Sequence, residues 1–129
     1  MILCIRSDSE KVYIGLYEGD REKAGNSWVA GRELSVQILS FIENCCEKAS
    51  IQMNDIKGLV IYQGPGSYTG LRIACSVANS IGYSYDIPVI GSTGDRWIKN
   101  GTYQLLKSSR FTPISPIYGG EVYTTTPRK

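Results

Sequence analysis

The sequence predicts an α/β domain of the ribonuclease-H-like or actin-like (ASKHA) class, present as one half of that fold. Two observations support this class. The first is the element order β-β-β-α-β-α-β over residues 1–91, and the second is a glycine-rich turn that joins a buried strand to a helix at 63–72. A hairpin followed by alternating helices and strands is typical of a mixed sheet covered by helices.

The composition fits one globular domain. The chain has 129 residues, of which 42% are hydrophobic and 20% charged, enough for a single buried core. No apolar run approaches the ~18 residues that span a bilayer. Residues 1–6 read as a strand, without the basic start of a signal peptide. We therefore expect a cytoplasmic protein with no membrane partner.

The first half of the chain supplies a hairpin, a helix and a buried strand. Residues 1–6 and 11–17 are β-favouring runs around a polar turn, and a third strand is expected within 21–29. Residues 33–49 change to helical periodicity, with one apolar face. The members of that face are Leu34, Ile38, Phe41, Ile42, Cys45 and Ala49. The uninterrupted apolar run 58–62 predicts a buried strand.

The second half begins with a helix over 68–85 and a short strand over 86–91. Residues 95–107 predict a further helix, and 114–125 predict two short strands around a Gly119-Gly120 turn. We assign 1–91 to an actin-like N-terminal lobe. The remainder, 92–129, is expected to be the remnant of a truncated second lobe, a helix plus a strand pair.

Charge is distributed unevenly along the chain. The formal net charge is +2, too small to indicate a nucleic acid or membrane partner by itself. Residues 1–91 carry 8 basic and 10 acidic side chains, whereas 92–129 carry 6 basic and 2 acidic ones. A basic C-terminal part is compatible with an acidic partner, with RNA, or with simple solvation.

Catalytic and metal-binding groups are scarce. The sequence has no histidine, which excludes Ser–His and Cys–His nucleophiles and histidine-bound zinc. The four cysteines have no Cys-x-x-Cys spacing and fit small core residues in a reducing compartment. A Mg²⁺-dependent nuclease or phosphotransferase would need converging carboxylates, and the candidates are Asp8, Glu10, Asp55 and Asp86. We predict no catalytic residue and no metal ligand.

The turn after strand 58–62 contains Gly64, Pro65, Gly66 and Ser67. It lacks the lysine of a phosphate-binding loop and the spacing of a dinucleotide fingerprint. Ser67 is expected to cap the helix, and Gly66 is expected to need a conformation that other residues avoid.

Helix 68–85 has an apolar arc of about 200° at 100° per residue, wider than the ~100° stripe of a surface helix. Small residues recur every four positions within it, at Gly70, Ala74, Ala78 and Gly82. Such a ridge lets another backbone approach closely. Two interpretations are open: close packing against the protein's own sheet, or an interface with another chain that also uses Leu34 and Ile38 of helix 33–49.

The block Gly64-Pro-Gly-Ser-Tyr-Thr-Gly-Leu-Arg-Ile73, followed by Ile87-Pro-Val-Ile-Gly91, resembles the hallmark segment of the TsaB (YeaZ) family. Within it, Gly64, Pro65, Gly66, Ser67, Thr69, Gly70 and Arg72 match the family pattern. Gly120-Glu-Val-Tyr123 is similar to a later strand of that family. The resemblance implies an actin-like fold and a non-catalytic role in making threonylcarbamoyladenosine (t6A) in tRNA.

The resemblance also implies partners. TsaB-like proteins pair through two helices with TsaD, the catalytic subunit that holds ATP and metal, while the ATPase TsaE joins indirectly and tRNA is reached only through the complex. No cofactor is then expected on this chain alone. The chain departs from the family pattern at Arg6-Ser7, at Arg32-Glu-Leu-Ser35 and at Pro116-Ile-Tyr118. A homodimer, or a degenerate homologue that only self-associates, stays open, as does the nuclease alternative. The older peptidase label of the family is not supported, because no ligand cluster is present.

Overall fold

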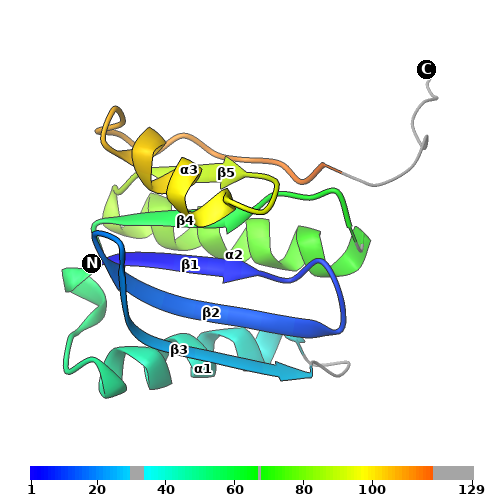
Figure 1. Ribbon diagram of the computed structural model, residues 1–129, viewed down its shortest axis with the longest axis horizontal. Helices are drawn as coiled ribbons and strands as arrows, with labels where there is room; N and C mark the ends of the chain where they lie inside the picture. Colours follow the sequence, from blue (N-terminus) through cyan, green and yellow to red (C-terminus); the bar gives the residue numbers. More distant parts are fainter. Residues whose placement is uncertain (30–33, 67, 118–129) are drawn as a thin grey trace.

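The structure, a computed structural model, describes residues 1–29, 34–66 and 68–117. These residues form one five-stranded mixed sheet with helices on both faces (Figure 1). The strand order across the sheet is β3-β2-β1-β4-β5. The order of elements along the chain is the predicted one, so the predicted fold class is confirmed.

The first three strands form an antiparallel meander. β1 (Ile2–Arg6) pairs with β2 (Lys11–Glu18), and β2 pairs with β3 (Arg21–Val29). The alternation along β2 sends Val12, Ile14 and Leu16 to one face, where all three are fully buried. Period-two alternation thus gives the sheet one fully covered face.

β4 (Gly58–Tyr62) and β5 (Val89–Ser92) extend the sheet in parallel from β1. Every residue of β4 is buried, as its continuous apolar run predicts for a central parallel strand. The strand predicted for 86–91 begins at Val89 instead. It starts later because Asp86 has φ 53° and belongs to the turn that ends the preceding helix.

Two helices cover one face of the sheet and a third covers part of the other (Figure 1). α1 (Leu34–Lys48) packs on β2 and β3, and α2 (Tyr68–Tyr85) packs on β4 and β1. α3 (Trp97–Leu105) lies across β4 and β5 on the opposite face. A short 3₁₀ turn, η1 (Met53–Asp55), precedes β4. Within the described residues, no helix is both long and apolar enough to cross a bilayer.

Residues 108–117, which follow α3, form an extended segment and not a strand. We call this segment the strap. It runs back along the β5 side of the sheet (Figure 1), and residues 114–117 are not part of a ladder. The strand pair predicted for 114–125 is therefore wrong over 114–117, because this backbone bonds to Asn79 and Gln63 and not to a neighbouring strand. Asn79 of α2 bonds both Ile114 backbone groups, at 2.9 and 3.0 Å. The rest of the predicted pair, with Gly119 and Gly120, lies outside the described residues.

Candidate functional site

The turn between β4 and α2 is held from two sides. Gly64 has φ 121°, and a side chain on it would overlap the carbonyl oxygen of Ile117. The peptide bond between Gly64 and Pro65 is cis. The Gln63 carbonyl accepts a hydrogen bond from the Ile117 amide at 2.7 Å, and the Gln63 side chain donates to the Ser115 carbonyl at 2.7 Å. The strap therefore fixes the start of the glycine-rich motif.

The other side of the turn meets the β1–β2 loop. Ser7 is completely buried, and its hydroxyl donates to the Gly70 carbonyl at 2.7 Å. A Cβ on Gly66 would overlap Asp8. Glycine is thus required at 66 for close approach and not for conformation, since the positive φ belongs to Gly64. The prediction of an unusual backbone at Gly66 is wrong, although the residue type is explained.

The remaining motif residues point to different surroundings. Ser67, the predicted cap, lies outside the described residues. Thr69 and Arg72 are exposed on α2. Together with Ile73 and Ser76 they line a shallow hollow of about 310 Å³. The motif thus combines a turn built for packing with a polar, solvent-facing start of α2.

The small-residue ridge of α2 faces the protein's own interior. Ala74 and Ala78 are 0% exposed and belong to the main core, and a Cβ on Gly82 would overlap Val89 and Phe111. Gly70 is also buried. The ridge lets α2 lie close to the sheet and the strap. The predicted interface role of Gly70, Ala74, Ala78 and Gly82 is therefore corrected to intramolecular packing.

The same correction applies to the two α1 residues. Leu34 and Ile38 are 6% and 0% exposed, because they pack between α1 and the sheet. A partner does not reach side chains buried in this way.

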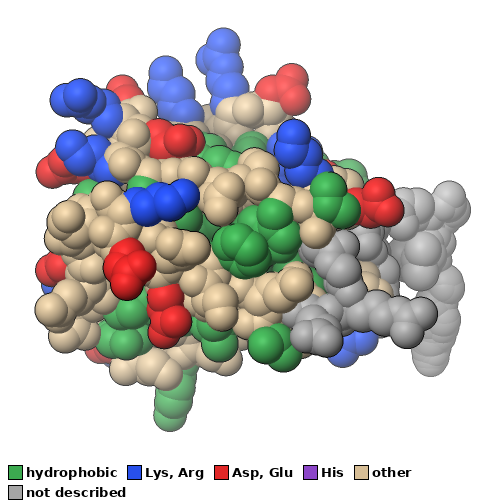
Figure 2. Space-filling view, turned by 90° about the horizontal axis from the view of Figure 1, so that it is seen from below, with side chains coloured by type: hydrophobic (Ala, Val, Ile, Leu, Met, Phe, Trp, Pro, Cys, Tyr) green, Lys and Arg blue, Asp and Glu red, His purple; other side chains and the backbone are tan. Residues whose placement is uncertain are grey.

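A different set of residues forms the outer surface of the helix pair. Val36 and Leu39 of α1 are 66% and 49% exposed. A hollow of about 140 Å³ between the two helices is lined by Leu39, Ser76, Val77, Ser80 and Ile81. Figure 2 looks at the molecule from the side on which α1 lies, and hydrophobic side chains are exposed there among polar ones. We call Val36, Leu39, Ile73, Ser76, Val77 and Ser80 the α1–α2 surface.

The candidate nuclease carboxylates do not converge. Asp8 and Glu10 lie beyond the end of β1, whereas Asp55 and Asp86 precede β4 and β5 at the opposite edge of the sheet. Asp55 accepts a hydrogen bond from the Gln52 amide at 2.9 Å. Among the described residues, no three His, Cys, Asp or Glu side chains are grouped so that they could hold a metal ion.

A paired cation occupies the end of β1. Arg6 bonds both carboxylate oxygens of Asp8, at 2.8 and 3.1 Å, and its guanidinium lies 3.9 Å from the centre of the Tyr62 ring. The hydrogen bond from Arg6, assisted by its charge, lowers the pKa of Asp8. Both charges are therefore neutralised locally, and Asp8 is not free to act as a base.

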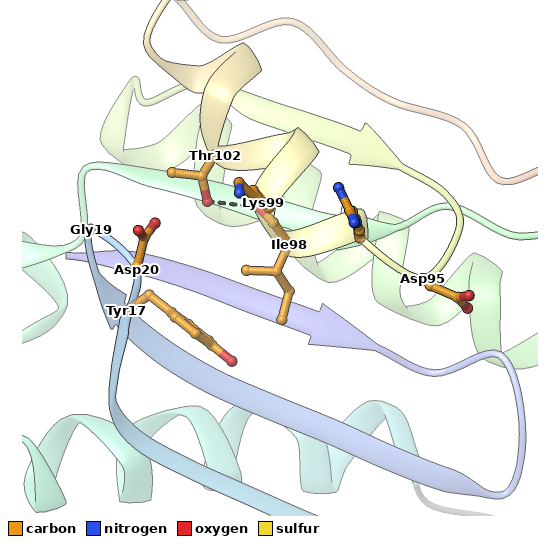
Figure 3. Close-up of a pocket in the computed structure, with 8 residues that line it drawn as sticks. Tyr17, Gly19, Asp20, Asp95, Ile98, Lys99 and Thr102 are labelled. Atoms are coloured by element: carbon orange, nitrogen blue, oxygen red, sulfur yellow. Dashed lines mark hydrogen bonds between the residues drawn. The ribbon is translucent and has the colours of Figure 1, made fainter.

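A cavity of about 500 Å³ lies between α3 and the β2–β3 turn (Figure 3). Tyr17, Asp20, Ile98, Lys99 and Thr102 line it together with Gly19, Asp95 and Arg96. Figure 3 shows Asp20 on the hairpin turn and Asp95 well apart from it, before α3. The two carboxylates do not form a pair, and the cavity has no acid–base arrangement.

The thiols are not poised for chemistry. Burial raises the pKa of Cys4 to about 12 and that of Cys75 to about 11. Thiols with such pKa values stay protonated near neutral pH and are poor nucleophiles. They act as small core residues, as the sequence predicts.

Comparison with known proteins identifies relatives over most of the chain. The family model described as "TsaD: tRNA N6-adenosine threonylcarbamoyltransferase" matches residues 28–108. Proteins named tRNA threonylcarbamoyladenosine biosynthesis protein TsaB are 24% identical in Haemophilus influenzae and 27% in Bacillus subtilis. Each alignment covers 95% of this chain, and 51% and 53% of those proteins. The chain spans about half the length of the curated relatives it matches.

A solved structure titled "YeaZ from Pseudomonas aeruginosa" shares the fold. It superposes with a TM-score of 0.65 at 20% identity, over 71% of this chain and 42% of that one. A tRNA N6-adenosine threonylcarbamoyltransferase of Staphylococcus haemolyticus is 37% identical over 62 residues, which is 48% of this chain and 18% of that protein.

Proposed function

Because the chain belongs to the TsaD family, and within it to the TsaB (YeaZ) proteins, we propose that it is a non-catalytic partner protein in tRNA threonylcarbamoyladenosine biosynthesis. Its role is to bind a TsaD-like catalytic subunit. ATP and metal belong to that subunit, a TsaE-like ATPase joins indirectly, and tRNA is the substrate of the complex rather than of this chain alone. The complex acts in the cytoplasm.

The observation that carries this proposal is the α1–α2 surface. Its α2 members Ile73, Ser76, Val77 and Ser80 are spaced i, i+3, i+4 and i+7, which places them on one helical face. Val36 and Leu39 add exposed apolar area beside them. Helices that meet another helix pair through small and apolar side chains pack at close distance. The surface therefore suits a helical partner better than a small ligand.

The chemistry of the chain supports a binding role. The Asp8 carboxylate is paired with Arg6, Asp55 and Asp86 lie at the opposite edge of the sheet from Asp8 and Glu10, and burial raises the pKa values of Cys4 and Cys75. A nuclease would need at least two carboxylates on one metal ion, and no observation in the described residues favours that alternative.

The test is a substitution at the exposed apolar part of the surface. Leu39→Arg places a charge where the partner helix would pack. We therefore expect the Leu39→Arg variant to bind the TsaD-like protein of the same organism more weakly than the unaltered protein does. A central interface change costs about 2 kcal/mol or more, roughly thirtyfold in Kd. Isothermal titration calorimetry measures the change.

Leu106→Arg is the matched control, since Leu106 is 80% exposed just after α3, away from the two helices. Circular dichroism should show both variants folded. Equal affinity of the two variants contradicts the proposed surface. Homodimerisation that is lost in Leu39→Arg, without any binding to the TsaD-like protein, assigns the surface to self-association instead.

A further inference from the structure

The exposed face of α3 is basic. Arg96, Lys99 and Lys107 are exposed, and Tyr103 between them is 58% exposed. The buried residues Trp97, Gly101 and Leu105 occupy the opposite side of the helix. Arg96 is the N-cap residue of α3 and Lys107 follows its C-cap, whereas Lys99 and Tyr103 lie within the helix. At 100° per residue, Lys99 and Tyr103 are 40° apart on the side away from the buried residues. These four residues form one outward stripe, which we call the α3 stripe.

Within residues 1–29, 34–66 and 68–117, the cations of the α3 stripe form no salt bridge. The two salt bridges found among the described residues are Arg6–Asp8 and Lys23–Glu18. Asp20 and Asp95 lie beside the cavity at the start of α3 (Figure 3), yet neither forms an ion pair with Arg96 or Lys99. Cations without a salt bridge on α3 and at its two ends leave a positive potential available to a polyanion.

Length and side-chain type favour a nucleic acid strand. α3 itself is roughly 14 Å long at the helical rise of ~1.5 Å per residue, and Arg96 and Lys107 flank its two ends. The Lys107 ammonium lies over one face of the Tyr103 ring, 4.5 Å from its centre, and the Tyr103 residue is 58% exposed. Basic side chains that follow a phosphate backbone, with an exposed aromatic ring for a base, are the recurring features of single-stranded nucleic acid sites. Arg110 continues the basic character into the strap.

We propose that the α3 stripe binds the phosphate backbone of RNA, with Tyr103 stacking on an unpaired base. The choice of RNA among polyanions rests on the proposed role in tRNA modification. The proposal replaces the expectation that this chain reaches tRNA only through its partner. It uses the face of the sheet opposite α1 and α2, so one molecule can hold a helical partner and an RNA strand together.

The test compares two charge-matched variants of the full chain. Lys99→Glu/Lys107→Glu alters the stripe, whereas Lys11→Glu/Lys48→Glu alters two exposed lysines elsewhere. The probe is an unmodified, fluorescein-labelled tRNA transcript, followed by anisotropy from ~50 to ~200 mM salt. We expect the stripe variant to bind at least about tenfold more weakly at ~50 mM salt. Its log–log salt slope should be shallower by about one per lysine lost. The control variant should match the unaltered protein.

Tyr103→Ala should weaken binding by at least about fivefold and Tyr103→Phe should not, because phenylalanine keeps the stacking face. Polyglutamate is the competitor that distinguishes an acidic protein partner. If it displaces the tRNA at equal charge concentration, the stripe is a protein site and the proposal is overturned. Absence of tRNA binding, or equal losses in both double variants, overturns it too.

The failure of this inference is distinguishable from failure of the proposed function. The Lys99→Glu/Lys107→Glu variant should keep its affinity for the TsaD-like protein. If the unaltered protein binds the TsaD-like protein but not the tRNA, only the proposal for the α3 stripe is overturned. If it binds the tRNA but not the TsaD-like protein, only the proposal for the α1–α2 surface is overturned.

Discussion

Arg6 and Asp8 lie two residues apart where β1 ends, and their ion pair fixes the loop against which the glycine-rich turn packs. The Asp8 side chain is 17% exposed and that of Arg6 is 35% exposed. A Cβ on Gly66 would overlap Asp8, so the position of the carboxylate and the absence of a side chain at 66 depend on each other. The pair therefore has a structural role at the candidate site.

The pKa of Asp8 gives a pH-dependent prediction. Because the hydrogen bond from Arg6 lowers it below the ordinary value, ionised Asp8 stabilises the fold above pH ~4. That contribution is lost as the pH falls through the lowered pKa. We expect Asp8→Asn to lower the free energy of unfolding at pH 7 by roughly 0.5–1 kcal/mol, as for a partly exposed pair. The difference should shrink toward pH 2.

Urea unfolding at pH 7 and at pH 2.5 measures both differences. Glu18→Gln is the control, because its partner Lys23 lies at 3.5 Å and the Glu18 side chain is 70% exposed. This change should have almost no effect at either pH. A loss in Asp8→Asn that is the same at both pH values contradicts the linkage.

At the scale of single elements, helix α2 shows how far the sequence pattern reaches. Its bounds, its wide apolar arc and its small-residue ridge are all readable from periodicity. Which neighbour meets the ridge is not readable, because a sheet and a foreign helix both favour small side chains. The structure assigns the ridge to the sheet and the strap, through Ala74, Ala78 and Gly82.

The other elements could be predicted from the sequence to different degrees. The strand 58–62 follows from its unbroken apolar run, and the hairpin follows from two β-favouring runs around a polar turn. The strap could not be predicted, because Asn79 and Gln63 hold it through long-range hydrogen bonds. The sequence correctly indicated that the turn needs glycine. It could not show that the positive φ lies at Gly64 or that Gly66 packs against Asp8, because both depend on segments distant in sequence.

The buried ridge leads to a prediction about α2. Ala78→Arg introduces a long cation at a fully buried position, so we expect the monomer to unfold or to lose several kcal/mol of stability. Ser80→Arg, two residues further on the exposed face, should stay as stable as the unaltered protein. Thermal unfolding followed by circular dichroism compares the two. A folded Ala78→Arg monomer that merely fails to associate would restore the intermolecular assignment of the ridge.

At the scale of the whole molecule, the strap joins parts that are far apart in the chain. Phe111 packs beside Gly82 and its ring lies 6.1 Å from that of Tyr83. Further along, Ile114 is bound by Asn79, and Ile117 is bound by Gln63 at the motif turn. The end of the described chain thereby stabilises the same turn that the β1–β2 loop holds from the other side, so the geometry of the site depends on the complete domain.

The strap can be tested by removing one side chain. Asn79→Ala deletes two hydrogen bonds to Ile114, each contributing about 1 kcal/mol. Asn44→Ala on the exposed face of α1 is the control. We expect hydrogen exchange at the Ile114 amide to accelerate by at least about tenfold in Asn79→Ala. Because the strap continues to Gln63, the Ile117 amide should lose protection as well. If only Ile114 responds, the strap is two independent contacts. If neither amide responds, Asn79 does not hold the strap, and the turn at Gly64 is fixed by its own packing.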